Sequence, residues 1–133
     1  MSLLDSFEIK HKQDETLSLG DIPVVFLSYD EPNADTNFEH LKKYHPNKHI
    51  IHRVHGVKGF DAAHKEAARV ADSDRFFTVD ADCLVDKTIW HKQLEITSDI
   101  SVATFSWSSR NIVNGLVYGN GGIKLWYSDY VKN

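Results

Sequence analysis

Residues 76 to 85 read Phe76-Phe77-Thr78-Val79-Asp80-Ala81-Asp82-Cys83-Leu84-Val85, a short apolar run that ends in two acids. Aromatic and β-branched residues fill its first positions, which predicts a buried strand of a parallel sheet. Ligands of open α/β sheets bind outside the carboxyl ends of the strands, so Asp80 and Asp82 are expected to face a binding site. Two carboxylates at that place suit Mg²⁺ or Mn²⁺ as a cofactor.

The spacing of the two acids is not specific by itself. With 13 aspartates among 133 residues, about 1.3 Asp-x-Asp triplets are expected by chance. The chain contains a second triplet, Asp72-Ser73-Asp74, which follows a helical pattern and is interpreted as a solvated turn. Only the first triplet follows a buried strand, and this favours a functional site there. The alternative is that Asp80 and Asp82 are turn and helix-capping carboxylates.

The composition is that of a single globular domain. Hydrophobic residues make up 41% of the chain and charged residues 26%. A net charge of −4 and a pI near 6.0 argue against nucleic acid as the partner. The single cysteine, Cys83, excludes an internal disulfide, and no apolar segment near the amino terminus resembles a signal peptide, so we expect a cytoplasmic protein. No apolar stretch is long enough for a transmembrane segment.

Alternating strand and helix patterns predict an α/β fold. A second apolar run covers residues 22–27 and leads through a polar loop into a helix, which is expected to be capped at Asp35-Thr36 and to end before Pro46. A third strand is predicted at 49–57, helices at 60–71 and 88–96, and a strand at 100–107. This order implies a parallel sheet covered by helices, with residues 1–21 as a peripheral arm.

Glycines are concentrated near the carboxyl terminus. Four of the seven lie in the segment Asn114-Gly115-Leu116-Val117-Tyr118-Gly119-Asn120-Gly121-Gly122. Such density permits tight turns and close approach of the backbone to a ligand. The segment is expected either to border a ligand as a mobile loop or to form a plain hairpin at Asn120-Gly121, because Asn-Gly is a strong turn signal.

Taken together, these features resemble a glycosyltransferase of the GT-A fold, nearest to the family 2-like group of phage and bacterial type. The resemblance covers roughly residues 22–126 and is strongest over 59–84, where a small-residue helix, a turn and a strand lead to Asp80-Ala81-Asp82. It implies a three-layer α/β/α nucleotide-diphospho-sugar transferase-like domain with a mostly parallel central sheet. The implied activity is metal-dependent transfer of a sugar, as by a hexosyltransferase, from a nucleotide-sugar donor to an unknown acceptor such as a glycan, protein or lipid.

The resemblance also implies roles for individual residues. Asp82 would hold the divalent cation, and Asp80 would contact the ribose, or the metal through water. Tyr29, Asp30 and Glu31 would meet the base and ribose, and Lys58 and His64 would face the diphosphate. On the acceptor side the residues would be Tyr118, Gly121, Gly122 and Trp126.

Two features depart from the family pattern. Ala63-His64-Lys65 stands where many members have Ala-Arg-Asn on the helix. GT-A domains are also longer, and the part missing here usually supplies a further metal ligand and a general base, for which Asp86, Asp99 or Asp129 would have to substitute. A non-catalytic nucleotide- or sugar-binding module, or a structural metal or interaction domain, therefore remains an alternative.

Overall fold

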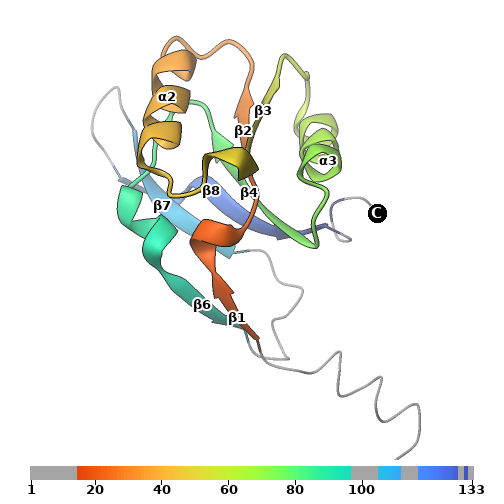
Figure 1. Cartoon of the computed structure of the whole chain (residues 1–133). Coiled ribbons are helices and arrows are strands. Elements are labelled where there is room, and N and C mark those ends of the chain that lie inside the picture. Colours follow the sequence, from red (N-terminus) through yellow and green to blue (C-terminus); the bar gives the residue numbers. More distant parts are fainter. Residues whose placement is uncertain (1–14, 97–104, 112–116, 129–130, 132–133) are drawn as a thin grey trace, which may run out of the picture.

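The fold is described from a computed structural model, which covers residues 15–96, 105–111, 117–128 and 131 (Figure 1). The helices are α2 (Ala34–Tyr44) and α3 (Phe60–Ala71), with short 3-10 turns η1 (Leu19–Asp21), η2 (Lys48–Ile50) and η3 (Lys87–His91). The strands are β1 (Glu15–Ser18), β2 (Val24–Ser28), β3 (Ile51–His55), β4 (Arg75–Asp80), β5 (Cys83–Leu84), β6 (Gln93–Ile96), β7 (Phe105–Asn111) and β8 (Val117–Tyr127). Among these residues no helix is both long and apolar enough to cross a lipid bilayer.

The main sheet has six strands in the order β3-β2-β4-β8-β7-β5. Its two halves differ in direction. β2 pairs parallel with both β3 and β4, whereas β4 pairs with β8, β8 with β7, and β7 with β5 in antiparallel fashion. β1 and β6 form a separate antiparallel pair at the lower end of the molecule in Figure 1.

The expected three-layer α/β/α GT-A architecture with a mostly parallel central sheet is therefore wrong. The main sheet is mixed, a second small sheet is present, and the described residues contain two α-helices, one packed on each face of the main sheet. The reason is local. Crossover helices connect β2 to β3 and β3 to β4, but no α-helix follows β4 in the part of the chain that the structure describes, so β8 returns antiparallel.

The stretch around Asp80 confirms the prediction of a buried strand. From Arg75 to Val79 every residue of β4 is buried, and the strand lies in the middle of the sheet between β2 and β8. Asp80 is the last residue of β4 and is exposed. A continuous apolar run bounded by polar residues was sufficient to identify this strand, because both of its faces are covered.

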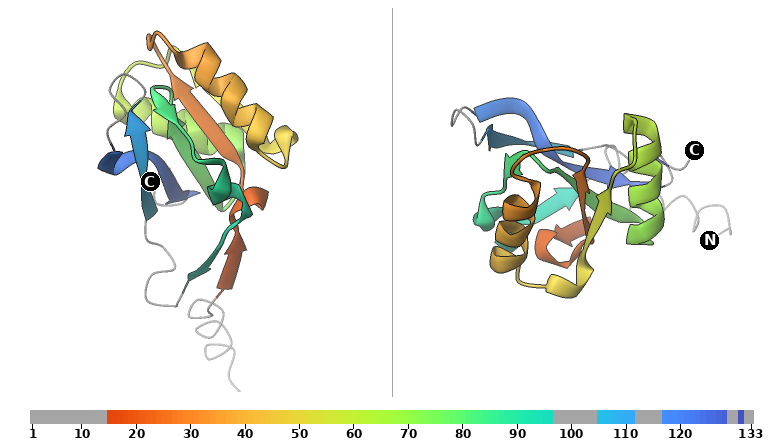
Figure 2. Two further views of the ribbon diagram at one scale, coloured as in Figure 1. Left: turned by 90° about the vertical axis from the view of Figure 1, so that its left-hand side faces the viewer. Right: turned by 90° about the horizontal axis from the view of Figure 1, so that it is seen from above.

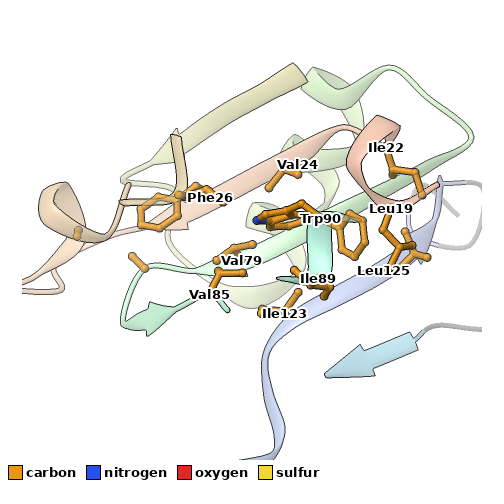
Figure 3. Packing of buried hydrophobic residues seen from close by; sticks show 14 residues of the cluster. Leu19, Ile22, Val24, Phe26, Val79, Val85, Ile89, Trp90, Ile123 and Leu125 are labelled. Atoms are coloured by element: carbon orange, nitrogen blue, oxygen red, sulfur yellow. The ribbon is translucent and has the colours of Figure 1, made fainter. Parts of the chain in front are cut away.

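The two faces of the sheet are covered by different helices (Figure 2). Leu41 of α2 and Trp90 of η3 pack with Phe26, Val79 and other residues in the larger core cluster, part of which Figure 3 shows. On the opposite face the small side chains of α3, Ala67, Ala68 and Ala71, pack on Val25 and Phe76. The alanine stripe allows α3 to approach the sheet closely, as its sequence predicted.

Other local predictions were only partly correct. The strands at 22–27 and 49–57 and the helix at 60–71 are present as β2, β3 and α3. The helix before Pro46 is also present, but it begins at Ala34 after Asn33, so the predicted cap at Asp35-Thr36 is wrong. The triplet Asp72-Ser73-Asp74 is a turn in which Asp72, with φ 48°, ends α3 in the left-handed conformation.

The predicted helix at residues 88–96 does not form. Asp86 accepts hydrogen bonds from the backbone nitrogen and the hydroxyl of Thr88 at 3.0 and 2.9 Å, and this starts only the short turn η3. The remaining residues form β6, which pairs with β1. Because Leu19 directly after β1 is buried in the larger core cluster, this pairing is joined to the main core. Nonlocal pairing has overridden a local helical pattern here.

The glycine-rich segment is not a hairpin at Asn120-Gly121, since β8 runs through it. The register shifts there: Trp107 pairs with Ile123, but Ser109 pairs with Tyr118, so the residues from Gly119 to Gly122 lie opposite Ser108 alone. Extra residues in one strand interrupt the regular pairing, as in a β-bulge or a related irregularity. The glycines of residues 117–122 therefore lie within an irregularly paired strand, where neither a loop nor a hairpin forms.

Candidate functional site

A cleft of about 330 Å³ lies at the carboxyl ends of β2, β3 and β4, beside the start of α3. Its lining residues are Leu27, Ser28, Tyr29, Glu31, Val54, Val57, Lys58, Gly59, Phe60, Ala63, His64, Asp80 and Asp82. Leu27, Val54 and Val57 also belong to the α3-side cluster or pack against it, so the cleft is on the α3 side of the sheet. This is the position at which open α/β sheets bind ligands.

The Asp80-Ala81-Asp82 turn is held from the opposite side of the sheet. The backbone nitrogen of Ala81 donates to the carbonyl of Leu27 at 3.0 Å, and the amide Nδ2 of the buried Asn37 donates to the carbonyl of Ala81 at 2.7 Å. The side chain of Ala81 is fully buried in the α2-side core. With Ala81 fixed inward, its two acidic neighbours both lie on the cleft.

The two carboxylates affect each other. Asp80 keeps contact with solvent, yet the protein around its carboxyl group excludes part of its water, and this burial together with the charge of Asp82 raises the pKa of Asp80 to about 6. Lys124 opposes the rise, and Glu31 adds to it. A cleft that holds like charges close together is suited to a cation.

Hydrogen bonds fix the start of the loop that carries Tyr29. The hydroxyl of Ser28 accepts from Nε of Arg53 at 2.9 Å and is also hydrogen-bonded to Nδ1 of His55 at 2.7 Å. The backbone carbonyl of Ser28 accepts from Gly56 at 2.9 Å. The ends of β2 and β3 are thus joined, and the Tyr29 ring, which is 52% exposed, leaves an anchored point.

Glu31 and Asp30 behave differently although both were assigned to the nucleoside. Glu31 lines the cleft, and its Oε1 accepts from the backbone nitrogen of Tyr29 at 2.7 Å, which closes the loop on itself. Asp30 is exposed and is not among the residues that line the cleft.

Lys58 and Gly59 lead into the amino terminus of α3 at the cleft. Gly59 has φ 97°, a backbone conformation that residues other than glycine rarely adopt. It stands at the N-cap position of α3, where no side chain caps the helix. The first amide groups of α3 therefore lack a side-chain acceptor, and with the ammonium group of Lys58 they form an electropositive wall. An anionic group in the cleft would meet both.

His64 lies one turn into α3 and is largely buried. Its Nδ1 lies 2.7 Å from the carbonyl oxygen of Phe60, and because a carbonyl only accepts, Nδ1 carries the proton. Nε2 is then the unprotonated nitrogen. Burial, with a smaller effect of Lys124, lowers the pKa of His64, so the ring is neutral at pH 7.

One face of β8 also borders this region. Strand alternation places Gly122, Lys124 and Trp126 on the α3 side. The Trp126 ring contacts His64 at a centroid distance of 5.0 Å, and its Nε1 donates to the hydroxyl of Thr78 at 2.8 Å. Lys124 Nζ lies 5.7 Å from the ring centre of Phe60.

Gly122 packs directly against the acids. A Cβ atom at this position would lie 2.1 Å from Sγ of Cys83 and 3.0 Å from Cβ of Asp80. Only glycine leaves enough room for β8 to pass the end of β4 at this distance. Of the four residues assigned to the acceptor side, Gly122 and Trp126 thus lie beside the cleft residues, whereas the side chain of Tyr118 and the surroundings of Gly121 lie outside the described part.

Of the three aspartates expected to supply a further metal ligand or a general base, only Asp86 lies in the described part of the chain, and it does not join the site. Asp86 is exposed and caps η3, and its two hydrogen bonds to Thr88 lower its pKa. Asp99 and Asp129 lie outside the described residues.

Sequence reasoning missed three residues: Asn37, Phe60 as a cleft residue, and Lys124. The signal for Lys124 was its place between the buried Ile123 and Leu125, which marks it as the outward position of a strand. Asn37 gave a weaker signal, since a buried asparagine on a helix is recognisable only when its partner, here the carbonyl of Ala81, is known.

Asp80 and Asp82 are the residues that would hold a divalent cation. Among the residues described, no group of three or more His, Cys, Asp or Glu side chains is arranged to bind a metal ion. Mg²⁺, however, is usually held by one or two carboxylates together with substrate phosphates and water. Burial and, second to it, repulsion by Asp82 raise the pKa of Asp80, and a bound cation would offset both, so the two acids fit a metal shared with a phosphate ligand.

Comparison of the chain with models of known protein families, with curated proteins and with solved structures found no significant match.

Proposed function

We propose that the chain binds a nucleotide-diphosphate-sugar together with Mg²⁺ or Mn²⁺ and transfers the sugar to an acceptor hydroxyl. The single observation that carries the proposal is the convergence of Tyr29, Glu31, Lys58, His64, Asp80 and Asp82 on one cleft. These residues come from three separate segments of the chain, 29–31, 58–64 and 80–82. They combine an aromatic ring, hydrogen-bond acceptors, a cation and a carboxylate pair in a volume of about 330 Å³, at the lower end of the range of small-molecule sites.

The charges suggest an order along the cleft. Lys58 and the uncapped amino terminus of α3 favour the diphosphate on that side. Asp80 and Asp82 would hold the cation against the same phosphates, and the cation would neutralise the charge that develops on the leaving diphosphate. The Tyr29 loop is left for the nucleoside.

Transfer requires one bond to form and one to break. The acceptor hydroxyl oxygen bonds to the anomeric carbon of the sugar, the bond from that carbon to the diphosphate oxygen breaks, and its electron pair leaves with the nucleoside diphosphate. The hydroxyl proton passes to a base.

A cytoplasmic setting fits the one cysteine, Cys83, which is buried and forms no disulfide. Nucleic acid is not proposed as a partner, in keeping with the net charge of −4.

Calorimetry with UDP and GDP, each with and without Mn²⁺, tests the binding part of this proposal. Asp82→Asn should weaken diphosphate binding in the presence of Mn²⁺ by about tenfold or more, since it removes a charged ligand at nearly constant volume. Asp72→Asn is the matched control, because Asp72 lies in the other triplet and asparagine accepts its left-handed conformation. Equal binding by the parent and Asp82→Asn, with no effect of Mn²⁺, would refute the metal role.

Transfer itself is tested with a panel of nucleotide-sugars by following release of free nucleoside diphosphate. Release that depends on Mn²⁺ and is lost in Asp82→Asn supports an enzyme. Metal-dependent binding without any release, across the panel and with simple sugar acceptors, would instead identify a binding module.

A further inference from the structure

Among the residues whose side-chain burial the structure describes, few large hydrophobic side chains remain exposed, and two of the three lie at the cleft. They are Phe60 at 64% relative exposure, Tyr29 at 52% and Leu84 at 36%. Phe60 and Tyr29 both line the cleft, whereas Leu84 does not. An exposed aromatic ring loses the benefit of burial unless something covers it. Two such rings in one cleft therefore indicate a ligand with an apolar, flat surface.

Phe60 is exposed but not loosely held. Its ring stacks on that of His64 with centroids 4.0 Å apart and 27° between the planes. His64 is fixed in turn by the bond from Nδ1 to the carbonyl of Phe60 and by the edge of Trp126. Trp126 is tied to β4 through its hydrogen bond to Thr78. This series of contacts presents the exposed part of the Phe60 ring in a defined orientation, as a preorganised binding surface requires.

The surroundings favour a base attached to phosphate over a purely apolar ligand. Lys124 Nζ lies 5.7 Å from the ring centre of Phe60, and Lys58 and Gly59 directly precede Phe60 in the chain and line the same cleft. Asp80 and Asp82 complete the polar part. Every nucleobase has a π face, so it can stack on an aromatic side chain whichever hydrogen-bond donors and acceptors its edge carries.

We propose that Phe60 is a stacking wall for the nucleobase and that Phe60 and Tyr29 hold the base from two sides. This inference rests on the proposed function, which it deepens by assigning the base to residues on both the β2 and the α3 side of the cleft. Such a pair of rings recognises a base by shape, so it predicts binding of both uridine and guanosine nucleotides with modest discrimination between them.

The test is a set of titrations of the full chain with three probes: pyrophosphate with Mn²⁺, UDP with Mn²⁺, and uridine alone. Phe60→Ala should weaken binding of UDP and of uridine by at least about fivefold, the low end of base stacking on an aromatic ring. Pyrophosphate binding should not change. Phe60→Tyr should retain affinity and Phe60→Leu should not, because leucine keeps apolar bulk without a flat face. Leu84→Ala is the control for removal of an exposed hydrophobic side chain outside the cleft.

Each result decides the inference. Unchanged UDP binding in Phe60→Ala overturns it, and so does an equal loss for UDP and pyrophosphate, which would mean that Phe60 acts on the phosphate side or on the fold. A thermal melt of each variant identifies the latter case. If the parent binds uridine in a Phe60-dependent way but shows no metal-dependent diphosphate binding, the stacking wall stands and the proposed transfer falls. If the parent binds none of the three probes, both fail.

Discussion

In the parallel half of the main sheet, formed by β3, β2 and β4, the polar residues that line the cleft lie at or just after the ends of the strands, whereas in the antiparallel half the residues that border the cleft lie within one strand. Tyr29 and Glu31 come after β2, and Asp82 comes two residues after the end of β4. Gly122, Lys124 and Trp126, by contrast, are successive positions on one face of β8. The parallel half supplies polar groups at strand ends, and the antiparallel half supplies one face of a strand beside the cleft.

This difference has a mechanical consequence. Groups at strand ends are on loops, so they need additional bonds to keep their positions, such as the bond from Asn37 to Ala81 and the network around Ser28. Groups on β8 are held by the pairing of the strand itself with β4 and β7. Substitutions in β8 should therefore affect the fold and the site together, while substitutions at strand ends should affect mainly the site.

The largest effect is expected for Gly122→Ala. The new methyl group would lie 2.1 Å from Cys83 Sγ and 3.0 Å from Asp80 Cβ, so β8 has to move away from β4. Overpacking of this kind typically destabilises a protein by about 1–3 kcal/mol. Denaturant unfolding should show a loss in that range, and calorimetry should show weaker diphosphate binding because Asp80 is displaced.

Adding Cys83→Ala to Gly122→Ala removes the sulfur atom that the methyl group meets. The double variant should recover part of the lost stability, and the two substitutions should be non-additive in a double-mutant cycle. Additive effects, or an unaffected Gly122→Ala protein, would mean that the two halves of the sheet are not packed as closely as this contact requires.

The sequence was informative about the parallel half for a physical reason. β2 and β4 are covered on both faces, so each is a continuous apolar run, and the polar residues that follow mark the carboxyl end. The small-residue stripe of α3 could also be recognised from neighbouring residues alone, and the bounds of the helix, Phe60–Ala71, agree with the prediction. From these elements the position of Asp80 and Asp82 at the cleft was predictable.

The antiparallel half was not predictable in the same way. Whether a strand after β4 runs parallel or antiparallel depends on how the chain returns to the sheet, and the helix that the sequence predicted at residues 88–96 is replaced by η3 and β6. The glycines were read as a loop or hairpin because the bulge is defined only by the pairing with β7. Lys124 and Phe60 were missed since their role depends on contacts between β8 and α3.

A smaller effect is expected for Asp80→Asn, measured as stability against pH. The native carboxyl has its pKa raised to about 6 from the ordinary aspartate value of 3.8, so between these values the native state binds more protons than the unfolded state. The free energy of unfolding that Asp80 contributes therefore falls as the pH rises through this window. Asp80→Asn should be more stable than the parent above pH 6, by roughly 1 kcal/mol after allowance for the solvent contact of the carboxyl.

The difference between Asp80→Asn and the parent should vanish below about pH 4, where both side chains are neutral. Thermal melts of both proteins from pH 4 to pH 8 measure this. A constant offset across the range would show that Asp80 acts through packing and not through its charge. Added Mn²⁺ should stabilise the parent more than Asp80→Asn if the two acids share a cation.

The smallest effect is expected for Lys124→Met, and it tests whether the two halves of the sheet are coupled by charge. Lys124 on β8 lowers the pKa of Asp80 at the end of β4 and also that of His64 on α3. Methionine keeps the aliphatic chain and removes the ammonium group, so the pKa of Asp80 and the pKa of His64 should both rise. NMR titration of the two side chains measures this directly.

Lys92→Met is the control. It removes an equal charge, but Lys92 does not contribute to the pKa shift of Asp80 or of His64, so both pKa values should stay unchanged. If Lys124→Met leaves both pKa values unchanged, β8 contributes only packing to the site. If only one of the two pKa values changes, Lys124 interacts with that side chain alone, and it does not couple Asp80 to His64.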